Sequence, residues 1–288
     1  MKGETRVFEP APVQEGERSA QTKTDFLLGG RVRLAQPDRG FRAAIDPVFL
    51  AAAIPEVEEG ARLLDLGTGT GAAALCLAAR MPACRVVGLD IQADLIHWAR
   101  DNVRANGVEA RVEMLAGDLL HPPPVPALMP GGFDHVLANP PYLAAGTASL
   151  PPDGPRALAV AEGEADLDAW VRFAVSMVRP GGTITFVHRA DRLGDLLAAF
   201  DHRAGNHRAG DLAIYPLWPR AGLPAKRVLV QARRGSRAPL RLLAGLVLHE
   251  AGGGFTAEAE AVLRHGQSVA LSAPRLTRAS SGPRQEGS

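Results

Sequence analysis

Polar residues that could bind a ligand follow an apolar run at residues 63–64. Asp65 comes first, and Gly67, Gly69 and Gly71 then occupy every second position. Glycine allows a backbone with positive φ to approach a ligand closely, and a helix that begins after such a turn offers free N–H groups and a partial positive charge. The pattern therefore predicts a strand, a tight turn and a helix that together bind a small polar ligand.

Three more polar groups follow later apolar runs. Asp90 lies about 25 residues after the first acid, close to the spacing at which an acid meets ribose hydroxyls in nucleotide-binding folds. Asp118 ends the next run, and the tetrapeptide Asn139-Pro140-Pro141-Tyr142 ends the one after it. Taken alone, Asp90 is better explained as a helix N-cap, and Asp118 is ambiguous. Their ordered placement at consecutive runs favours one shared site.

The runs predict the elements that must position these residues. Strands are expected at residues 63–66, 85–90, 111–116, 133–138, 183–188, 212–215 and 227–231, with helical periodicity between most of them. We therefore expect an α/β fold: a Rossmann-like, seven-stranded and mostly parallel sheet with helices on both faces, an N-terminal hairpin and helix, and a small C-terminal cap. Ligands of such sheets bind beyond the carboxyl ends of the strands.

The chain divides into five predicted segments, namely a disordered arm, a hairpin with one helix, a core, a cap and a disordered tail. Their bounds are residues 1–22, 23–60, 61–235, 236–272 and 273–288. The hairpin is expected to turn at Gly29-Gly30, and the helix to begin at Asp46 as N-cap before Pro47.

Composition narrows the class of protein. The chain has 288 residues, of which 46% are hydrophobic, and no apolar run is long enough to span a bilayer. Cys76 and Cys84 form no CxxC or Cys/His pattern, so neither a disulfide nor a metal site is expected. A cytoplasmic monomer or homodimer is predicted. The net charge of +1 does not indicate a nucleic-acid partner, although a local patch would be enough.

One stretch offers such a patch, because residues 212–249 contain seven basic residues and no acid. This predicts a phosphate-binding edge, to which the hairpin could add. A solvated strand rim explains the stretch equally well. The candidate nucleic-acid contacts are Arg31, Arg33, Arg220, Lys226, Arg233, Arg234 and Arg237.

The glycine turn resembles motif I of the class I S-adenosylmethionine-dependent methyltransferases. Dinucleotide-binding folds prefer Gly-x-Gly-x-x-Gly, whereas here the glycines follow an acid at alternate positions. The resemblance implies that the glycines line the methionine end of the cofactor and that Asp65 orders the turn. It also implies that Asp90 takes the ribose hydroxyls and Asp118 the adenine amine. The implied cofactor-binding residues of this region are Asp65, Gly67, Thr68, Gly69, Gly71, Asp90, Ile91, Asp118, Leu119 and Asn139.

The tetrapeptide at residues 139–142 resembles the acceptor motif of methyltransferases that act on adenine N6, guanine N2, cytosine N4 or a glutamine amide. A planar amine becomes cationic as it is methylated, and two hydrogen-bond acceptors on its protons favour that state. The resemblance implies the side-chain oxygen of Asn139 and the carbonyl of Pro140 as the acceptors, and Tyr142 as a stacking face. The prolines hold this backbone in an extended geometry, and no general base is required.

The flanks are similar to the bacterial tRNA(Val) adenine-N6 methyltransferase family. Residues 36–50, which include Arg42 and Asp46, resemble a segment that closes over the cofactor in that family, and residues 215–233 resemble its C-terminal part. The resemblance implies that tRNA is the partner and that the acceptor is the adenine 3′ of the anticodon in a valine tRNA.

Other functions stay open. A release factor glutamine N5-methyltransferase uses the same motif, but it carries a helical domain where this chain predicts an arm, a hairpin and one helix. An rRNA base N-methyltransferase, for example a guanine-N2 enzyme, is a variant. A non-catalytic cofactor- or RNA-binding module would lose the acceptor residues, which are intact here. His135, His188 and Trp170 are expected to be structural.

Overall fold

The computed structural model describes residues 22–38, 45–141, 165–201 and 209–271. The predicted arm, apart from Thr22, and the predicted tail lie outside these residues. So do two predicted site residues, Arg42 and Tyr142.

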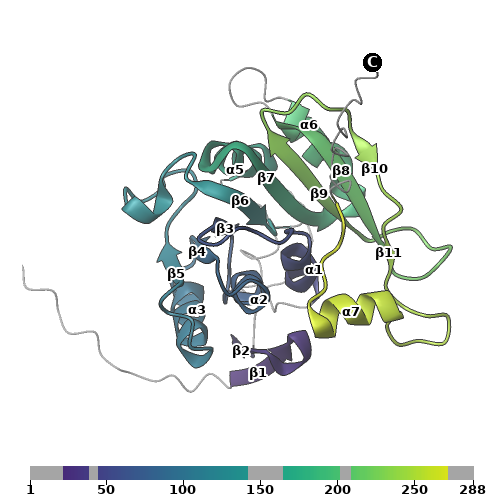
Figure 1. Ribbon diagram of the computed structural model, residues 1–288, viewed down its shortest axis with the longest axis horizontal. Helices are drawn as coiled ribbons and strands as arrows, with labels where there is room; N and C mark the ends of the chain where they lie inside the picture. The colour runs from purple at the N-terminus through teal and green to yellow at the C-terminus, as the bar shows by residue number, and fades with distance from the viewer. Residues whose placement is uncertain (1–21, 39–44, 142–164, 202–208, 272–288) are drawn as a thin grey trace, which may run out of the picture.

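The described residues form a nine-stranded sheet in the order β10-β8-β9-β7-β6-β3-β4-β5, with β11 also paired to β8 (Figure 1). The seven predicted strands are all present, as β3 (Arg62–Leu66), β4 (Arg85–Asp90), β5 (Val112–Ala116), β6 (Phe133–Ala138), β7 (Val178–Arg189), β8 (Ala209–Trp218) and β9 (Arg227–Arg234). Neighbouring strands are parallel except at β9, which is antiparallel to both β7 and β8. The predicted fold class is confirmed, and two-residue strands from the cap, β10 (Arg241–Leu242) and β11 (Leu246–Val247), extend the edge at β8.

The sheet has a switch point at β3. This strand pairs with β4 on one side and with β6 on the other, so the strand order reverses here and the chain connections on the two sides run in opposite directions. Ligands of open α/β sheets bind at such a point, beyond the carboxyl ends of the strands.

Helices cover both faces, because the central strands bury side chains in two directions. Leu63 and Leu64, adjacent on β3, belong to two different apolar clusters. The first cluster includes α1 (Asp46–Ala52), α2 (Ala72–Arg80), α3 (Ala93–Ala105) and α7 (Ala257–His265), and the second includes α5 (Leu167–Met177) and α6 (Leu193–Asp201). Strands buried on both faces read as continuous apolar runs, which is why periodicity located them. No helix in the described part of the chain has the length and apolar character needed to cross a membrane.

The predicted hairpin is confirmed as β1 (Thr22–Leu27) and β2 (Val32–Pro37), joined through the short 3-10 helix η1 (Leu28–Gly30). The turn has positive φ at Leu28, Gly29 and Gly30. The prediction for Asp46 was wrong in one respect, because Ile45 is the N-cap and Asp46 is the first helical residue. The C-terminal cap contains the helix α7, whose N-cap is Thr256, with its hydroxyl accepting a hydrogen bond from the Ala259 N–H.

The bounds of β7 differ from the prediction, which began the strand at residue 183, after Pro180-Gly181-Gly182. In the structure β7 begins at Val178 and includes these residues. Phe133 of β6 pairs with Val178, but His135 already pairs with Thr183, so the extra β7 residues form an irregularity in the register. Gly181, with a φ of 78°, allows the strand to absorb it.

Candidate cofactor and acceptor site

A cavity of about 390 Å³ lies at the carboxyl ends of the central strands. Most of the predicted site residues line it, namely Asp65, Gly67, Thr68, Gly69, Asp90, Ile91, Asp118, Leu119, Asn139 and Pro140. They come from four separate connections, after β3, β4, β5 and β6. Two predicted residues, Gly71 and Asp46, are not among its lining residues.

Asp65 fixes the conformation of the glycine turn through two hydrogen bonds. Its Oδ2 accepts hydrogen bonds from the Thr68 hydroxyl at 2.7 Å and from the N–H of Ala74, in the first turn of α2, at 3.2 Å. Burial raises the pKa of this carboxyl from 3.8 to about 7, although both hydrogen bonds lower it. The turn is also fixed from the other side, because the N–H groups of Gly67 and Thr68 donate to the Leu89 carbonyl at 2.8 and 3.1 Å.

The three glycines of the turn do different things, although all have positive φ. A Cβ on Gly67 would lie 2.7 Å from Cη2 of Trp170, so this glycine makes room for the indole. A Cβ on Gly69 would meet no described atom within 4 Å, so its backbone is open toward the cavity that it lines. Gly71 instead packs the start of α2, with Met114 and Ala99 as its nearest neighbours.

Asp90 links the turn after β4 to the glycine turn. Its Oδ2 accepts a hydrogen bond from the Gly69 N–H at 2.8 Å, and its Oδ1 accepts one from the Gln92 N–H at 2.9 Å. Burial raises the pKa of this carboxyl, and the two N–H groups lower it. The N-cap of α3 is Gln92, so Asp90 is not an N-cap, and both residues line the cavity.

The remaining predicted residues complete the wall. Asp118 accepts a hydrogen bond from the Leu120 N–H at 2.9 Å, which closes the turn after β5. Beside it, Leu119 and the exposed side chain of Ile91 add apolar surface to the cavity lining. This gives the cavity both carboxylates and an apolar wall.

The acceptor residues lie at the same cavity. Asn139 directly follows β6, and Pro140 and Pro141 continue the wall from there. The carboxyl end of β6 is the neighbour of β3, so the glycine turn and the acceptor residues share one opening. Tyr142, the last residue of the motif, lies outside the described residues.

Several residues of the wall were not among the predicted site residues. Trp170 of α5, expected to be structural only, lines the cavity opposite Gly67. Gln36 and Pro47 reach the cavity from β2 and α1, and both belong to residues 36–50, the segment that the family resemblance placed over the cofactor. A tryptophan on the apolar face of a helix carries no signal that would separate it from core residues.

Asp46 has a different setting from the one implied. Its carboxylate forms an ion pair with the Arg227 guanidinium, at 2.9 Å between Oδ2 and Nε. This joins the start of α1 to the start of β9 at the carboxyl edge of the sheet. Pro47 follows immediately and lines the cavity.

The candidate nucleic-acid contacts do not form one surface. Arg220 and Lys226 lie between the end of β8 and the start of β9, at the carboxyl edge. Arg233 and Arg234 end β9, which is antiparallel, so they lie with Arg237 at the opposite edge. Arg31 and Arg33 lie on the hairpin, a third location apart from both edges of the sheet.

Several of these cations are engaged within the protein. Arg233 donates to the Gly181 carbonyl and lies near the Asp211 carboxylate, and Arg234 donates to the Val178 carbonyl. Arg31 donates to the His265 carbonyl at the end of α7. The acid that faces Arg233, Asp211, lies one residue before the acid-free stretch, so composition alone could not show it.

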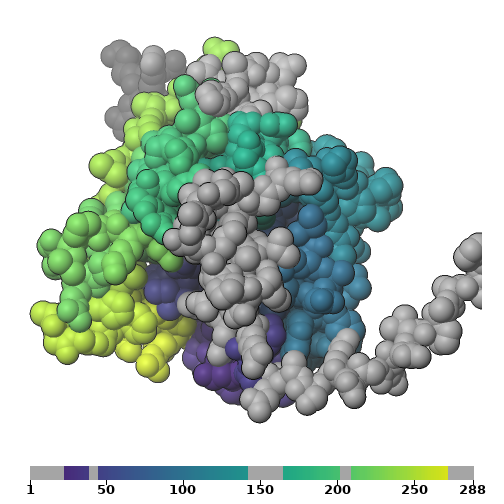
Figure 2. Space-filling view, turned by 180° about the vertical axis from the view of Figure 1, so that it is seen from behind, coloured from purple at the N-terminus to yellow at the C-terminus, as the bar shows by residue number. Residues whose placement is uncertain are grey.

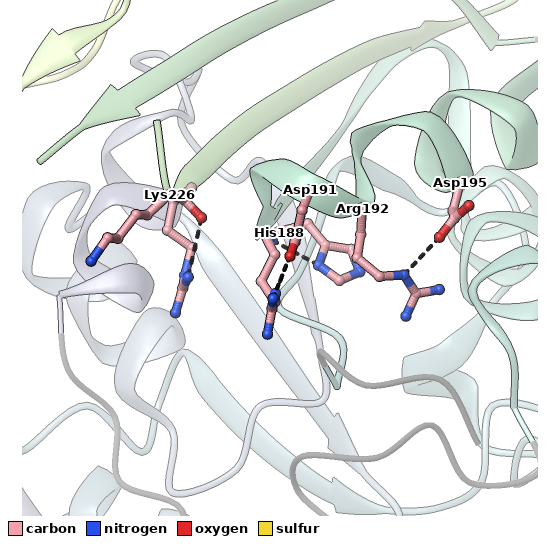
Figure 3. A network of polar contacts seen from close by, with 7 residues as sticks. His188, Asp191, Arg192, Asp195 and Lys226 are labelled. Carbon is pink, nitrogen blue, oxygen red and sulfur yellow. Dashed lines mark hydrogen bonds and ion pairs between the residues drawn. The ribbon is translucent and has the colours of Figure 1, made fainter. Parts of the chain in front are cut away.

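Beside the acceptor residues, the end of β7 carries a buried histidine within a polar network (Figure 3). His188 Nδ1 accepts a hydrogen bond from the Arg189 N–H at 2.8 Å, so the ring proton is assigned to Nε2. Burial, together with the nearby cations Arg192 and Arg227, lowers its pKa to about 4. His188 is therefore neutral at pH 7. Within the described residues no three His, Cys, Asp or Glu side chains gather as a metal site.

Comparison with known proteins agrees with this geometry. Residues 57–205 match the family model described as a methyltransferase domain. The chain belongs to the S-adenosylmethionine-dependent methyltransferase family. The cofactor of this methyltransferase is thus S-adenosylmethionine, whose sulfonium sulfur supplies an electrophilic methyl group.

Relatives of this methyltransferase carry two kinds of name. A protein of Porphyromonas gingivalis named tRNA1(Val) (adenine(37)-N6)-methyltransferase is 30% identical over 82% of this chain and 92% of its own length. A release factor glutamine methyltransferase of Chlorobaculum tepidum is 32% identical over 58% of each chain. Among solved structures, an Agrobacterium tumefaciens protein described as a predicted O-methyltransferase has a TM-score of 0.63 and 28% identity, over 77% of this chain and 97% of that one.

Proposed function

We propose that this methyltransferase transfers a methyl group to the exocyclic N6 of an adenine in tRNA, namely the adenine 3′ of the anticodon in a valine tRNA. The observation that carries this proposal is the extent of the match to the relatives. The Porphyromonas gingivalis tRNA enzyme aligns over 241 residues, well beyond the domain at residues 57–205. The Chlorobaculum tepidum release factor enzyme aligns over 58% of its length, and one from Cereibacter sphaeroides over 62%.

The cavity walls fit the parts of S-adenosylmethionine. We assign the open backbone at Gly69 to the methionine end, because it has no side chain and faces the cavity. Asp90 is assigned to the ribose hydroxyls, since its carboxylate lies beside Gly69 and can accept further hydrogen bonds. Asp118 is assigned to the adenine amine, with Ile91 and Leu119 against the faces of the base.

At the acceptor end, the chain supplies hydrogen-bond acceptors rather than a base. The Asn139 side-chain oxygen and the Pro140 carbonyl are assigned to the two protons of the amine, which favours the pyramidal, cationic nitrogen that forms as the methyl group arrives. Two consecutive prolines fix φ on this backbone, so the two acceptors are positioned before the substrate binds. The indole of Trp170 excludes water from the wall between Gly67 and the acceptor residues.

The RNA is proposed to cross the carboxyl edge of the sheet through Arg220 and Lys226. Both side chains are exposed, and neither makes an ion pair with another residue of the described ranges. In Figure 3 the Lys226 side chain extends away from Asp191 and Asp195. An exposed ammonium group of this kind can bind a phosphate.

The deciding experiment is methyl transfer from labelled S-adenosylmethionine to tRNA that lacks the modification, followed by nucleoside mass spectrometry. We expect N6-methyladenosine in a valine tRNA and no label in a release factor. Label in a release factor glutamine, with none in RNA, would refute the tRNA substrate and leave the methyltransferase family untouched.

The RNA-binding edge has a matched test. Arg220→Ala and Lys226→Ala should each raise the KM for tRNA about threefold to tenfold at low salt and reduce the salt dependence of binding by roughly one counterion. Arg237→Ala removes an exposed charge at the opposite edge and should change neither quantity. Equal effects of all three substitutions would exclude a specific binding edge.

A further inference from the structure

Strand β2 is hydrogen-bonded on both edges, although it belongs to a two-stranded sheet. One edge pairs with β1. On the other edge, the Asn106 side chain accepts from the Arg33 N–H at 2.9 Å and donates to the Arg33 carbonyl at 2.7 Å. The Asn102 side chain makes the same two bonds with Ala35, at 2.8 and 2.9 Å. Two asparagines of α3 thus take the place of a third strand.

The geometry of the two elements makes this pairing regular. Four residues along a helix rise by about 6 Å, and two residues along a strand by roughly 6.7 Å, so side chains at Asn102 and Asn106 meet alternate residues of β2. Figure 2 shows the result on the surface, where the hairpin in purple lies directly against the blue segment that holds α3. The hairpin is therefore docked by specific hydrogen bonds as well as by apolar packing.

Asn102 makes one contact that Asn106 does not. Its Nδ2 also donates to the Thr70 carbonyl at 3.0 Å, and Thr70 lies between Gly69 and Gly71 in the glycine turn. Asn106 makes its additional bond to the Asn102 carbonyl, within α3. Asn102 is 1% exposed, so these bonds form without competition from water.

Asn102 thus holds one residue that lines the cavity and the chain neighbour of another. Thr70 lines the cavity, and so does Gln36, the residue after Ala35. Gln36 is itself fixed from β1, because its Nε2 donates to the Asp25 carboxylate at 2.8 Å. We propose that Asn102 is a positioning residue for cofactor binding, because it joins the hairpin and the glycine turn into one preformed wall, whereas Asn106 only docks the hairpin.

The physical reason is preorganisation. A turn with glycines at three alternate positions has much conformational freedom to lose when a ligand binds. A hydrogen bond from a rigid helix to the centre of that turn removes part of this freedom before binding, which strengthens affinity. Loss of one buried hydrogen bond of this kind corresponds to about tenfold in an equilibrium constant.

The two asparagines provide a matched pair of variants. Asn102→Ala should weaken the affinity for S-adenosylhomocysteine, measured by calorimetry, about tenfold. Asn106→Ala should leave it within twofold, while both variants lower the melting temperature, Asn102→Ala by more because its side chain is buried. The KM for S-adenosylmethionine should follow the affinity, with kcat nearly unchanged. Equal affinity losses in the two variants would overturn the proposal, because they would show a purely structural role.

A second measurement uses the unaltered protein. Hydrogen–deuterium exchange should show that S-adenosylhomocysteine slows exchange in residues 67–71 and in residues 33–37 together, because Asn102 couples them. Protection of the glycine turn with no change in the hairpin would refute the coupling. Neither measurement involves the methyl acceptor, so both stand whether or not tRNA is the substrate.

Discussion

Gly67 offers a direct test of the geometry at the centre of the site. Gly67→Ala should lower the free energy of unfolding by two separate effects. The φ of 66° lies in the left-handed region, which costs alanine about 1 kcal/mol. The new Cβ would also lie 2.7 Å from Cη2 and 3.2 Å from Cζ3 of Trp170, and overpacking of this kind costs about 1–3 kcal/mol. The expected total is about 2–4 kcal/mol.

Gly69→Ala is the matched control. Its φ of 57° imposes the same backbone strain, but a Cβ there meets no described atom within 4 Å. It should therefore cost only about 1 kcal/mol. Urea denaturation followed by far-UV circular dichroism measures both variants against the native protein.

A double variant separates clash from strain. Trp170→Phe removes the six-membered part of the indole that faces Gly67, so Gly67→Ala should cost about 1–3 kcal/mol less in that background. If Gly67→Ala is no more destabilising than Gly69→Ala, or if the double variant is additive, the assigned packing of Trp170 on the turn is wrong.

Two further predictions concern single side chains of the cavity. Asn139→Ala should lower methyl transfer at least ~100-fold, because it removes one amine acceptor, while S-adenosylhomocysteine still binds in calorimetry; equal loss of binding would contradict the role assigned to Asn139. The pKa of Asp65 is about 7 in the folded state, against 3.8 for an ordinary aspartate. Between about pH 4 and 7 the unfolded chain therefore loses this proton while the folded protein keeps it, so the free energy of unfolding falls as the pH rises. Asp65→Asn abolishes this titration, so the stability of the variant relative to the native protein should rise by up to ~4 kcal/mol across that window and level off above it. A pH-independent difference in urea denaturation would show that Asp65 ionises normally.

Much of the fold could be predicted because the central strands are buried on both faces. Such strands give continuous apolar runs, and each polar residue that ends a run marks the carboxyl edge. Asp90, Asp118 and Asn139 were located in this way, and the structure brings all three to one cavity. The same signal cannot assign roles within a turn, so it could not separate Gly71, which packs α2, from Gly69, which faces the cavity.

Residues that reach the cavity from outside the strand ends gave no such signal. Periodicity places Gln36 on a hairpin before the core, and it was the family resemblance of residues 36–50, not periodicity, that placed this segment over the cofactor; in the structure the bonds from Asn102 to Ala35 hold it at the wall. Trp170 lies on the apolar face of α5, where its spacing matches core packing. Contacts between elements that are distant in the chain bring both residues to the cavity, and the periodicity of a sequence does not report such contacts.

The basic stretch fails as a single surface for a geometric reason. Arg227 and Arg234 begin and end β9. Seven residues of extended chain span roughly 23 Å, which is the distance along the strands from the carboxyl edge of the sheet to its amino edge. Charges that are close in sequence therefore face opposite ends of the molecule. At the amino end, Arg233 and Arg241 share Asp211, whereas the carboxyl end keeps Arg220 and Lys226 exposed beside the acceptor residues. Under the proposed tRNA function, an RNA that presents its base to Asn139 would reach the second pair and not the first, so strand direction, rather than composition, would select the charges that contribute to binding.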